Sequence, residues 1–269
     1  LNPMTDANLV RFLGKQTDRQ VGLLTTDAHD RLRDDSSELP FLIADACCDS
    51  DLLSLARAVA DMPLVTGGSG LARFLPVAYR EKGLLKSKPY EPAMPQIPGR
   101  GLVVAGSCSK ATRTQVERFA SECPGWQVCV ESVLNDPESE LQRLTAWASD
   151  VDADKPLFIY SSAAPEKVSE LQGQFGTETA SLAVEQFMAQ AARTFVGEFE
   201  VTRLVLAGGE TSGAIVRELG IRALAIGPEI CAGVPWTVTL DEERPLALAL
   251  KSGNFGGKDF FRDALEMLP

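Results

Sequence analysis

The feature that most constrains this fold is a regular alternation, beyond residue 98, of short apolar runs with amphipathic helical segments. Strand-length apolar runs separated by helices need crossover connections, which produce a mainly parallel sheet covered by helices. The sequence therefore predicts an α/β fold here. The expected strands are Leu102–Ala105, Trp126–Glu131, Leu157–Ser161, Arg203–Ala207, Ala223–Ile226 and Leu246–Leu250, and the expected helices are Thr112–Ser121, Glu138–Ser149, Glu178–Glu198, Ser212–Leu219 and Lys258–Leu268.

A proline-rich stretch separates this part of the chain from the residues before it. Four prolines lie between Pro89 and Pro98, and proline removes a backbone donor and disfavours helix in the preceding residue. We expect a linker here, with residues 1–92 in one domain and 93–269 in another. Each domain is expected to hold a mainly parallel sheet flanked by helices. In the first, the expected strands are Val21–Leu24 and Phe41–Ala44, and the expected helices are Asn8–Gln16 and Asp51–Met62.

Composition and charge exclude several classes of protein. Apolar residues make up 45% of the 269 positions, which is too many for a disordered chain, and no run approaches the ~20 apolar residues of a membrane span. The net charge of −11 repels nucleic acid and acidic lipid, so neither nucleic acid nor membrane is an expected partner. No secretory signal is visible, which favours a cytoplasmic protein.

Cysteine and histidine spacing predicts no metal site. The six cysteines form no CxxC pair, and the single histidine, His29, lies in a charge-rich segment typical of a surface loop. With one histidine in the chain, a Ser-His-Asp or Cys-His nucleophile is also disfavoured. We expect reduced thiols rather than disulfides.

Three glycine-rich loops share one position, because each follows an apolar strand and precedes a helix. Ligands collect at the carboxyl ends of strands in open α/β sheets, and these loops would converge there. Glycine allows close backbone approach to a phosphate, and the following helix adds free N–H groups and the positive end of its dipole. The loops are Ala105–Ser109, Ala207–Gly213 and Lys251–Gly257.

Neither of the two best-known phosphate motifs is present in these loops. The chain has no GxxxxGK[ST] loop and no GxGxxG fingerprint. A tight strand–helix turn and a phosphate site therefore both remain open as interpretations of each loop.

Several other residues also have two interpretations. Glu210 is either a magnesium or ribose contact or an exposed loop carboxylate, and Lys251 either balances phosphate charge or is solvated. Asp45 ends a strand and is either a base or a loop cap. The segment Pro228–Trp236 is expected to be a shaped loop between strands.

Longer stretches around these loops resemble the four-carbon acid sugar kinases, a family long catalogued as a domain of unknown function. The resemblance covers nearly the whole chain. It is carried by Pro3–Val10, Pro63–Ala72, Val104–Ser109, Val205–Gly213, Gly227–Ile230, Gly233–Trp236, Leu248–Gly257 and Asp259–Phe261.

The resemblance implies an activity, a division of labour between the domains and a set of site residues. It implies ATP-dependent phosphorylation of a four-carbon sugar acid (threonate, erythronate or a 3-oxo-tetronate), with ATP and Mg²⁺ as cofactors. The first domain would bind the sugar acid, and the C-terminal domain would bind the nucleotide. The residues implied to hold ATP are Ser107, Gly208, Gly209, Glu210, Thr211, Gly253, Asn254 and Gly256.

The chain departs from the family in one motif, an Asp-Asp-x-Thr-Gly on the first strand. The stretch Asp34–Glu38 lacks the glycine and lies elsewhere, so the chain resembles the family without the first part of its substrate domain, and no catalytic base is assigned. The alternative is a non-catalytic module that binds a nucleotide or phosphometabolite. An NAD-linked oxidoreductase is disfavoured by the missing fingerprint. Exposed strand edges leave a homodimer open.

Overall fold

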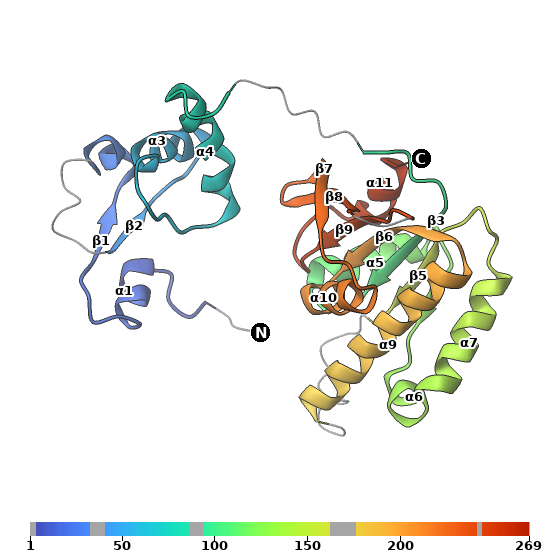
Figure 1. The fold of residues 1–269 in the computed structure, drawn as a ribbon. Helices are drawn as coiled ribbons and strands as arrows, with labels where there is room; N and C mark the ends of the chain where they lie inside the picture. Colours follow the sequence, from blue (N-terminus) through green and yellow to red (C-terminus); the bar gives the residue numbers. More distant parts are fainter. Residues whose placement is uncertain (1–3, 33–40, 87–93, 162–175, 241–243, 269) are drawn as a thin grey trace. The chain divides into compact units, whose positions relative to one another are not determined.

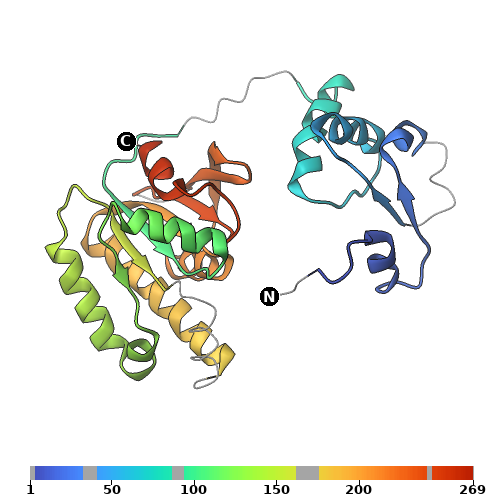
Figure 2. The same cartoon turned by 180° about the vertical axis from the view of Figure 1, so that it is seen from behind.

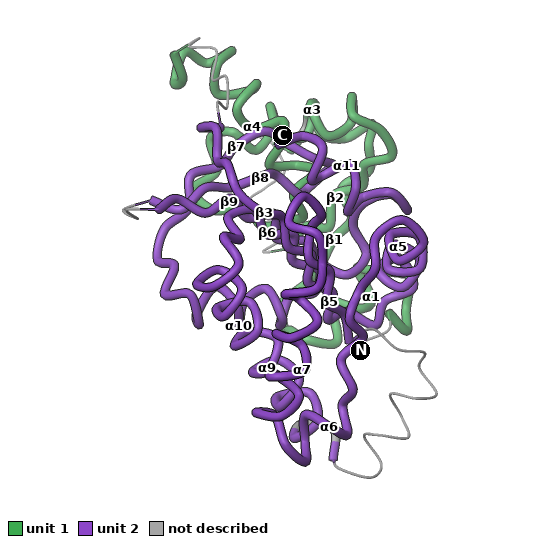
Figure 3. The backbone as a smooth tube through the Cα atoms, turned by 90° about the vertical axis from the view of Figure 1, so that its right-hand side faces the viewer, with its two compact units in different colours: residues 1–90 green, residues 91–269 purple. Residues whose placement is uncertain are grey.

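The protein is seen in a computed structural model that describes residues 4–32, 41–86, 94–161, 176–240 and 244–268 (Figure 1). The chain forms two compact units, residues 1–90 and 91–269, coloured green and purple in Figure 3. The boundary expected at 92/93 lies outside the described residues. No helix among those described is long and apolar enough to cross a membrane.

Unit 1 is a small α/β unit built on two parallel strands. Strand β1 (Val21–Leu24) pairs in register with β2 (Phe41–Ala44), as expected. Its core contains Leu24 of β1, with Leu55 and Val59 of α3. The remaining elements are α1 (Leu9–Gly14), the 3-10 helix η1 (Thr26–Arg31), α3 (Asp49–Val59) and α4 (Ser69–Glu81).

Unit 2 holds a seven-stranded sheet in the order β4-β5-β3-β6-β9-β8-β7. The first five strands of that order run parallel, while β8 is antiparallel to both β9 and β7. The mainly parallel α/β prediction is confirmed, with an antiparallel edge that the sequence did not indicate. The strands are β3 (Arg100–Ala105), β4 (Trp126–Gln127), β5 (Leu157–Tyr160), β6 (Val201–Ala207), β7 (Leu224–Cys231), β8 (Val234–Thr239) and β9 (Ala247–Lys251).

Helices cover both faces of this sheet because alternate residues of each central strand point to opposite sides. Leu102 and Val104 of β3 enter one core, whereas Val103 and Ala105 enter the other. The first core is covered by α6 (Val130–Asn135), α7 (Pro137–Asp150), α9 (Thr177–Glu198) and α10 (Gly209–Glu218). The second is covered by α5 (Lys110–Ala120) and α11 (Phe260–Glu266), seen in front in Figure 2.

One strand prediction and one loop prediction were wrong. The strand expected at Trp126–Glu131 is only two residues long, and α6 begins at Val130. The stretch Pro228–Trp236 is not a loop between strands: it holds the end of β7, the start of β8 and the hairpin turn between them, where Gly233 has φ 78°. Its prolines concealed the hairpin, because proline within a run argues against a strand. They fall where the β7–β8 register is irregular, which lets the sheet accept them.

The prediction that His29 lies in a surface loop was also wrong. Its side chain is 1% exposed, and its Nε2 lies 2.9 Å from the carbonyl oxygen of Asp45, just beyond β2. The charge-rich segment folds into η1, which turns His29 and Leu32 inward while charged neighbours such as Asp30 stay exposed. A short helix can thus bury one polar side chain within a segment that looks solvated.

Candidate nucleotide site

The three glycine loops follow β3, β6 and β9, which are neighbours in the sheet and end at the same level. Ala105 pairs with Ala207, and Ala207 pairs with Lys251. The amides of Gly106 and Ser107 both donate to the carbonyl of Ala207, at 2.9 and 3.1 Å, and the Gly208 amide donates to the Lys251 carbonyl at 2.9 Å. These backbone bonds join the loops into one rim at the carboxyl edge of the sheet.

The rim lies at a topological switch point. The loop after β3 leads to α5 on one face, and the loop after β6 leads to α10 on the other. The adjacent strands β3 and β6 therefore send their connections in opposite directions, which opens a crevice between them. This is the usual place for a ligand in a sheet of this kind.

Four of the predicted site residues contact one another at this rim. A β-carbon at Gly208 would lie 3.2 Å from the Ser107 amide and 3.2 Å from Thr211 Oγ1. A β-carbon at Gly253 would overlap the Ser107 hydroxyl and come within 3.0 Å of Ser109 Oγ. Glycine at these two positions is required for the loops to meet, whatever they bind. The structure thus brings Ser107, Gly208, Thr211 and Gly253 together.

The N-terminus of α10 opens onto the rim without a side-chain cap. Gly208 is the N-cap at φ 133°, and no side chain bonds to the first turn. Gly209 and Glu210 are exposed, and a β-carbon on Gly209 would meet no atom within 4 Å. The side chain of Thr211 is 5% exposed, so this position offers a ligand its amide rather than its hydroxyl. An uncapped helix start with exposed amides is suited to an anion.

The other two predicted residues lie further along the third loop. Asn254 is exposed, and Gly256, with φ 80°, passes over Phe260, where a β-carbon would lie 2.6 Å from the ring.

Three polar residues near the rim were not singled out by the sequence. Ser109 caps α5 and reaches the third loop, and Gln115, on the same helix, is buried beneath that loop. Glu185 of α9 lies close enough to Glu210 to feel its charge, and the pKa of Glu185 is raised by burial first and by Glu210 second. The sequence carries no local signal of a site at these residues, because only the tertiary fold brings them to the rim.

The interpretation of Lys251 as a solvated side chain was wrong. Its side chain is 1% exposed, so it lies inside unit 2. Burial lowers the pKa of its ammonium group to about 8, against a smaller opposing contribution from Cys231.

Asp45 directly follows β2 in unit 1, and it is exposed. Its amide donates to the Leu24 carbonyl at 2.9 Å, and its carbonyl faces His29. These backbone bonds tie the ends of β1 and β2 to η1 and leave the Asp45 carboxylate without an assigned role.

A cavity of about 830 Å³ lies at the opposite edge of the unit 2 sheet, around the first residues of β3 and β6. The guanidinium of Arg100 lines it but donates to the carbonyls of Val151, Asp152 and Lys155, at 3.0, 2.8 and 2.8 Å. This cavity is the main structural competitor to the glycine rim as a ligand site.

The sheet of unit 2 is covered by helices on both faces and has a glycine-rich rim. These features define the class of the protein as an α/β protein with a nucleotide-binding domain. Residues 102–261 match the family model of a nucleotide-binding C-terminal domain, and residues 1–75 match that of a sugar-binding N-terminal domain. The chain belongs to the four-carbon acid sugar kinase family.

The chain is similar to curated enzymes and to a solved structure over its full length. It is 44% identical to the 3-oxo-tetronate kinases of Cupriavidus necator and Pseudomonas fluorescens, covering 100% of this chain and 63% of each relative. It therefore spans less than two thirds of those relatives. A crystal structure of a Haemophilus influenzae protein of the DUF1537 family matches with a TM-score of 0.70 and 35% identity, over 100% of this chain and 65% of that one.

Proposed function

We propose that this protein is part of an ATP-dependent kinase that phosphorylates a four-carbon sugar acid, with a 3-oxo-tetronate as the first candidate and threonate and erythronate as the others. The observation that carries the proposal is the meeting of three glycine loops beside the uncapped start of α10. The names of the curated relatives support the sugar acid as the substrate class.

In this proposal the phosphates of ATP lie on the rim of unit 2. The amides of Gly209, Glu210 and Thr211 donate hydrogen bonds to phosphate oxygens at the positive end of the α10 dipole. The Ser107 hydroxyl lies on the other side of the phosphates. The γ-phosphorus is attacked by a hydroxyl oxygen of the sugar acid while the bond to the β-phosphate oxygen breaks. The products are the phosphorylated acid and ADP, and no side chain is assigned as the base.

The residues at the rim fit a bound Mg²⁺ only in part. Glu210 is exposed beside the proposed phosphates, and carboxylate oxygen is a ligand that Mg²⁺ accepts. Among the described residues no group of three or more acidic, cysteine or histidine side chains is placed to hold a metal. Phosphate oxygens and water would therefore complete the shell. When bound, the ion would neutralise charge on the transferred group.

Calorimetry and a turnover assay test the proposal together. The protein is titrated with ATP and Mg²⁺, and ADP release is then measured with 3-oxo-tetronate, threonate and erythronate, using both this chain and the product of the intact gene. Turnover with one acid supports the kinase. Binding of ATP without turnover by the intact gene product supports the alternative, a non-catalytic module that binds a nucleotide or phosphometabolite. Absence of ATP binding contradicts the kinase and a nucleotide-binding module, and leaves only a module that binds a phosphometabolite.

We also propose a cytoplasmic location, where ATP is available, and a homodimer as the assembly to be tested. Light scattering of the purified protein decides between a monomer and a dimer. A monomer at micromolar concentration would contradict the dimer.

A further inference from the structure

Lys251 places a positive charge inside unit 2, directly beneath the third glycine loop. Its ammonium donates to Thr112 Oγ1 and to the carbonyls of Ser252 and Gly253, each at 3.1 Å. It also lies 5.9 Å from the centre of the Phe260 ring. No carboxylate forms an ion pair with it in the described part of the chain. The ammonium thus donates two of its hydrogens to the loop backbone and the third to the Thr112 side chain.

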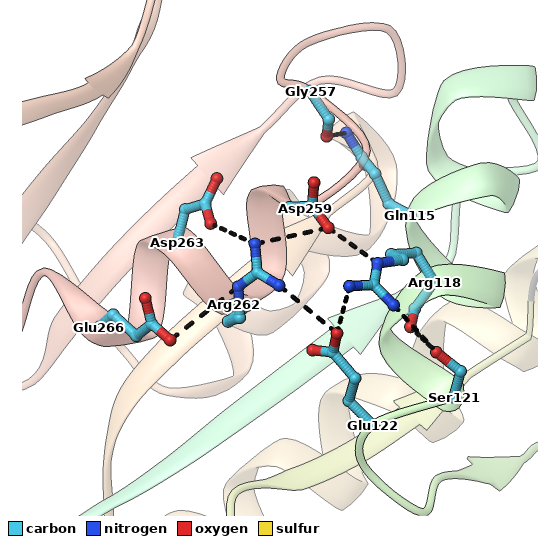
Figure 4. A network of polar contacts seen from close by, with 9 residues as sticks. All are labelled: Gln115, Arg118, Ser121, Glu122, Gly257, Asp259, Arg262, Asp263 and Glu266. Carbon is cyan, nitrogen blue, oxygen red and sulfur yellow. Dashed lines mark hydrogen bonds and ion pairs between the residues drawn. The ribbon is translucent and has the colours of Figure 1, made fainter.

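Three side chains of α5 bind the same loop from the same side. Ser109 Oγ and Thr112 Oγ1 donate to the Gly253 carbonyl at 2.6 and 2.9 Å. The amide group of Gln115 lies 3.0, 3.1 and 2.9 Å from the carbonyls of residues 255, 256 and 257, and Figure 4 shows its bond to Gly257. We call Ser109, Thr112, Gln115 and Lys251 the carbonyl clamp.

The clamp determines where the amides of the loop point. All described peptide bonds are trans, so each N–H points away from the carbonyl of the residue before it. Holding the carbonyls of residues 252, 253, 255, 256 and 257 inward therefore turns the amides of residues 253, 254, 256, 257 and 258 outward, away from α5. Within the described chain none of these five amides donates to a protein acceptor. Successive unpaired amides of this kind form a nest for an anion.

The buried charge of the clamp also lowers the free energy of unfolding, so stability alone would not explain the clamp. A buried charge without a carboxylate partner is expensive, and an apolar side chain of similar length would avoid the expense. The Oε1 atom of Gln115 is likewise buried and has no partner. A polar cluster retained at such a cost points to a role in holding the loop geometry.

We propose that Lys251, with Ser109, Thr112 and Gln115, is a positioning group that presents the amides of residues 253, 254, 256, 257 and 258 to the phosphate oxygens of the nucleotide. The inference rests on the proposed function, because it takes the rim to be the nucleotide site. It assigns the Lys251 ammonium to the loop backbone and not to the phosphate.

The test measures binding of ATP and of inorganic tripolyphosphate to clamp variants by calorimetry at pH 7. Thr112→Val keeps the shape of the side chain and removes the hydroxyl, whereas Thr112→Ser keeps the hydroxyl. We expect Thr112→Val and Lys251→Met each to weaken binding of both ligands at least tenfold, and Thr112→Ser to bind within about twofold of wild type. Thr112 is fully buried, so an effect of Thr112→Val on binding would be indirect, through the loop or through general destabilisation, which the control below separates.

Thr202→Val is the matched control. Thr202 is buried and its hydroxyl donates to the Pro98 carbonyl at 2.8 Å, at the far edge of the sheet. Thr202→Val removes the same kind of hydrogen bond as Thr112→Val. We therefore expect the two variants to have a similar fall in melting temperature, with ligand binding unchanged in Thr202→Val. The double variant Thr112→Val/Lys251→Met should lose less binding than the two single losses combined, because both act on the Gly253 carbonyl.

The outcomes separate the two proposals. If wild type binds ATP and tripolyphosphate but both Thr112→Val and Lys251→Met bind them equally tightly, the clamp is wrong and the nucleotide site stands. If Thr202→Val weakens binding as much as Thr112→Val does, the effect is general destabilisation and the clamp is again wrong. If wild type binds neither ligand, the proposed function itself fails. Should Lys251→Met not fold, the Thr112 pair decides.

Discussion

Met94 lies directly against Gly227, so closely that a β-carbon on this glycine would overlap the methionine sulfur. The contact joins the segment before β3 to strand β7, far along the chain. Ile97, in the same segment, is buried in the core beside α5 and α11. The end of the proline-rich stretch is therefore part of unit 2 and not a free linker.

This packing predicts where unit 2 can be cut. A fragment of residues 91–269 retains Met94 and Ile97 and should unfold in one cooperative transition in urea. A fragment of residues 99–269 loses both side chains and should be less stable by about 2–5 kcal/mol, the range for emptying a buried aliphatic position. Equal midpoints for the two fragments would mean that these contacts contribute nothing.

Gly209→Val tests the rim itself. The new side chain would project into the open space at the start of α10, where it would block phosphate from the helix amides. We expect ATP affinity to fall by at least ~100-fold, about 2.7 kcal/mol, while the melting temperature stays near that of wild type.

Gly197→Val in α9 is the control for this variant, because a β-carbon there also meets nothing within 4 Å. It should leave binding unchanged. If nucleotide binding survives in Gly209→Val, the ligand site is elsewhere, and a soaked crystal with density in the cavity near Arg100 would identify that competitor.

Lys251 makes stability depend on pH in a defined direction. Its pKa is about 8 in the folded protein and 10.5 ordinarily. Between these values the unfolded chain binds more protons, so this residue's contribution to the free energy of unfolding rises with pH from about 8 to about 10.5. Below pH 8 its burial cost is constant.

The measurement is urea unfolding of wild type and Lys251→Met across pH 7–11. Both proteins keep Cys231, whose charge acts on the Lys251 pKa. Wild type should gain stability relative to the variant as pH rises through this window. A flat difference would show that the ammonium has an ordinary pKa.

Trp236 should carry a large share of the core stability of unit 2. Its side chain is fully buried, and its Nε1 donates to the Ala264 carbonyl of α11 at 3.1 Å. Trp236→Phe leaves that acceptor unpaired and should cost about 1–3 kcal/mol. Trp236→Ala should cost about 3–5 kcal/mol.

Trp147→Phe provides the comparison, because Trp147 is only half-buried where it packs against the core, and this variant should cost less than about 1 kcal/mol. Denaturant midpoints of the three variants rank these contributions. A larger loss for Trp147→Phe than for Trp236→Phe would contradict this assignment of the core.

The alternation of apolar runs and helices determined the α/β class, and the glycine loops at strand ends were also evident from sequence. Both are local patterns, because a strand or a strand–helix turn is encoded within a few residues. The β7–β8 hairpin was missed since Pro228 and Pro235 are accepted only through an irregular register with neighbouring strands. His29 was misplaced because its burial depends on Asp45, beyond the next strand.

The sequence by itself thus determined most of the strands and helices of the parallel part of the sheet and which loops end at one edge of it. Only the tertiary structure decided what surrounds each polar side chain there. Lys251 is the clearest case, since its partner Thr112 is 139 residues away. Whether a charge is solvated or buried depends on groups brought from distant parts of the chain, and no local pattern contains that information.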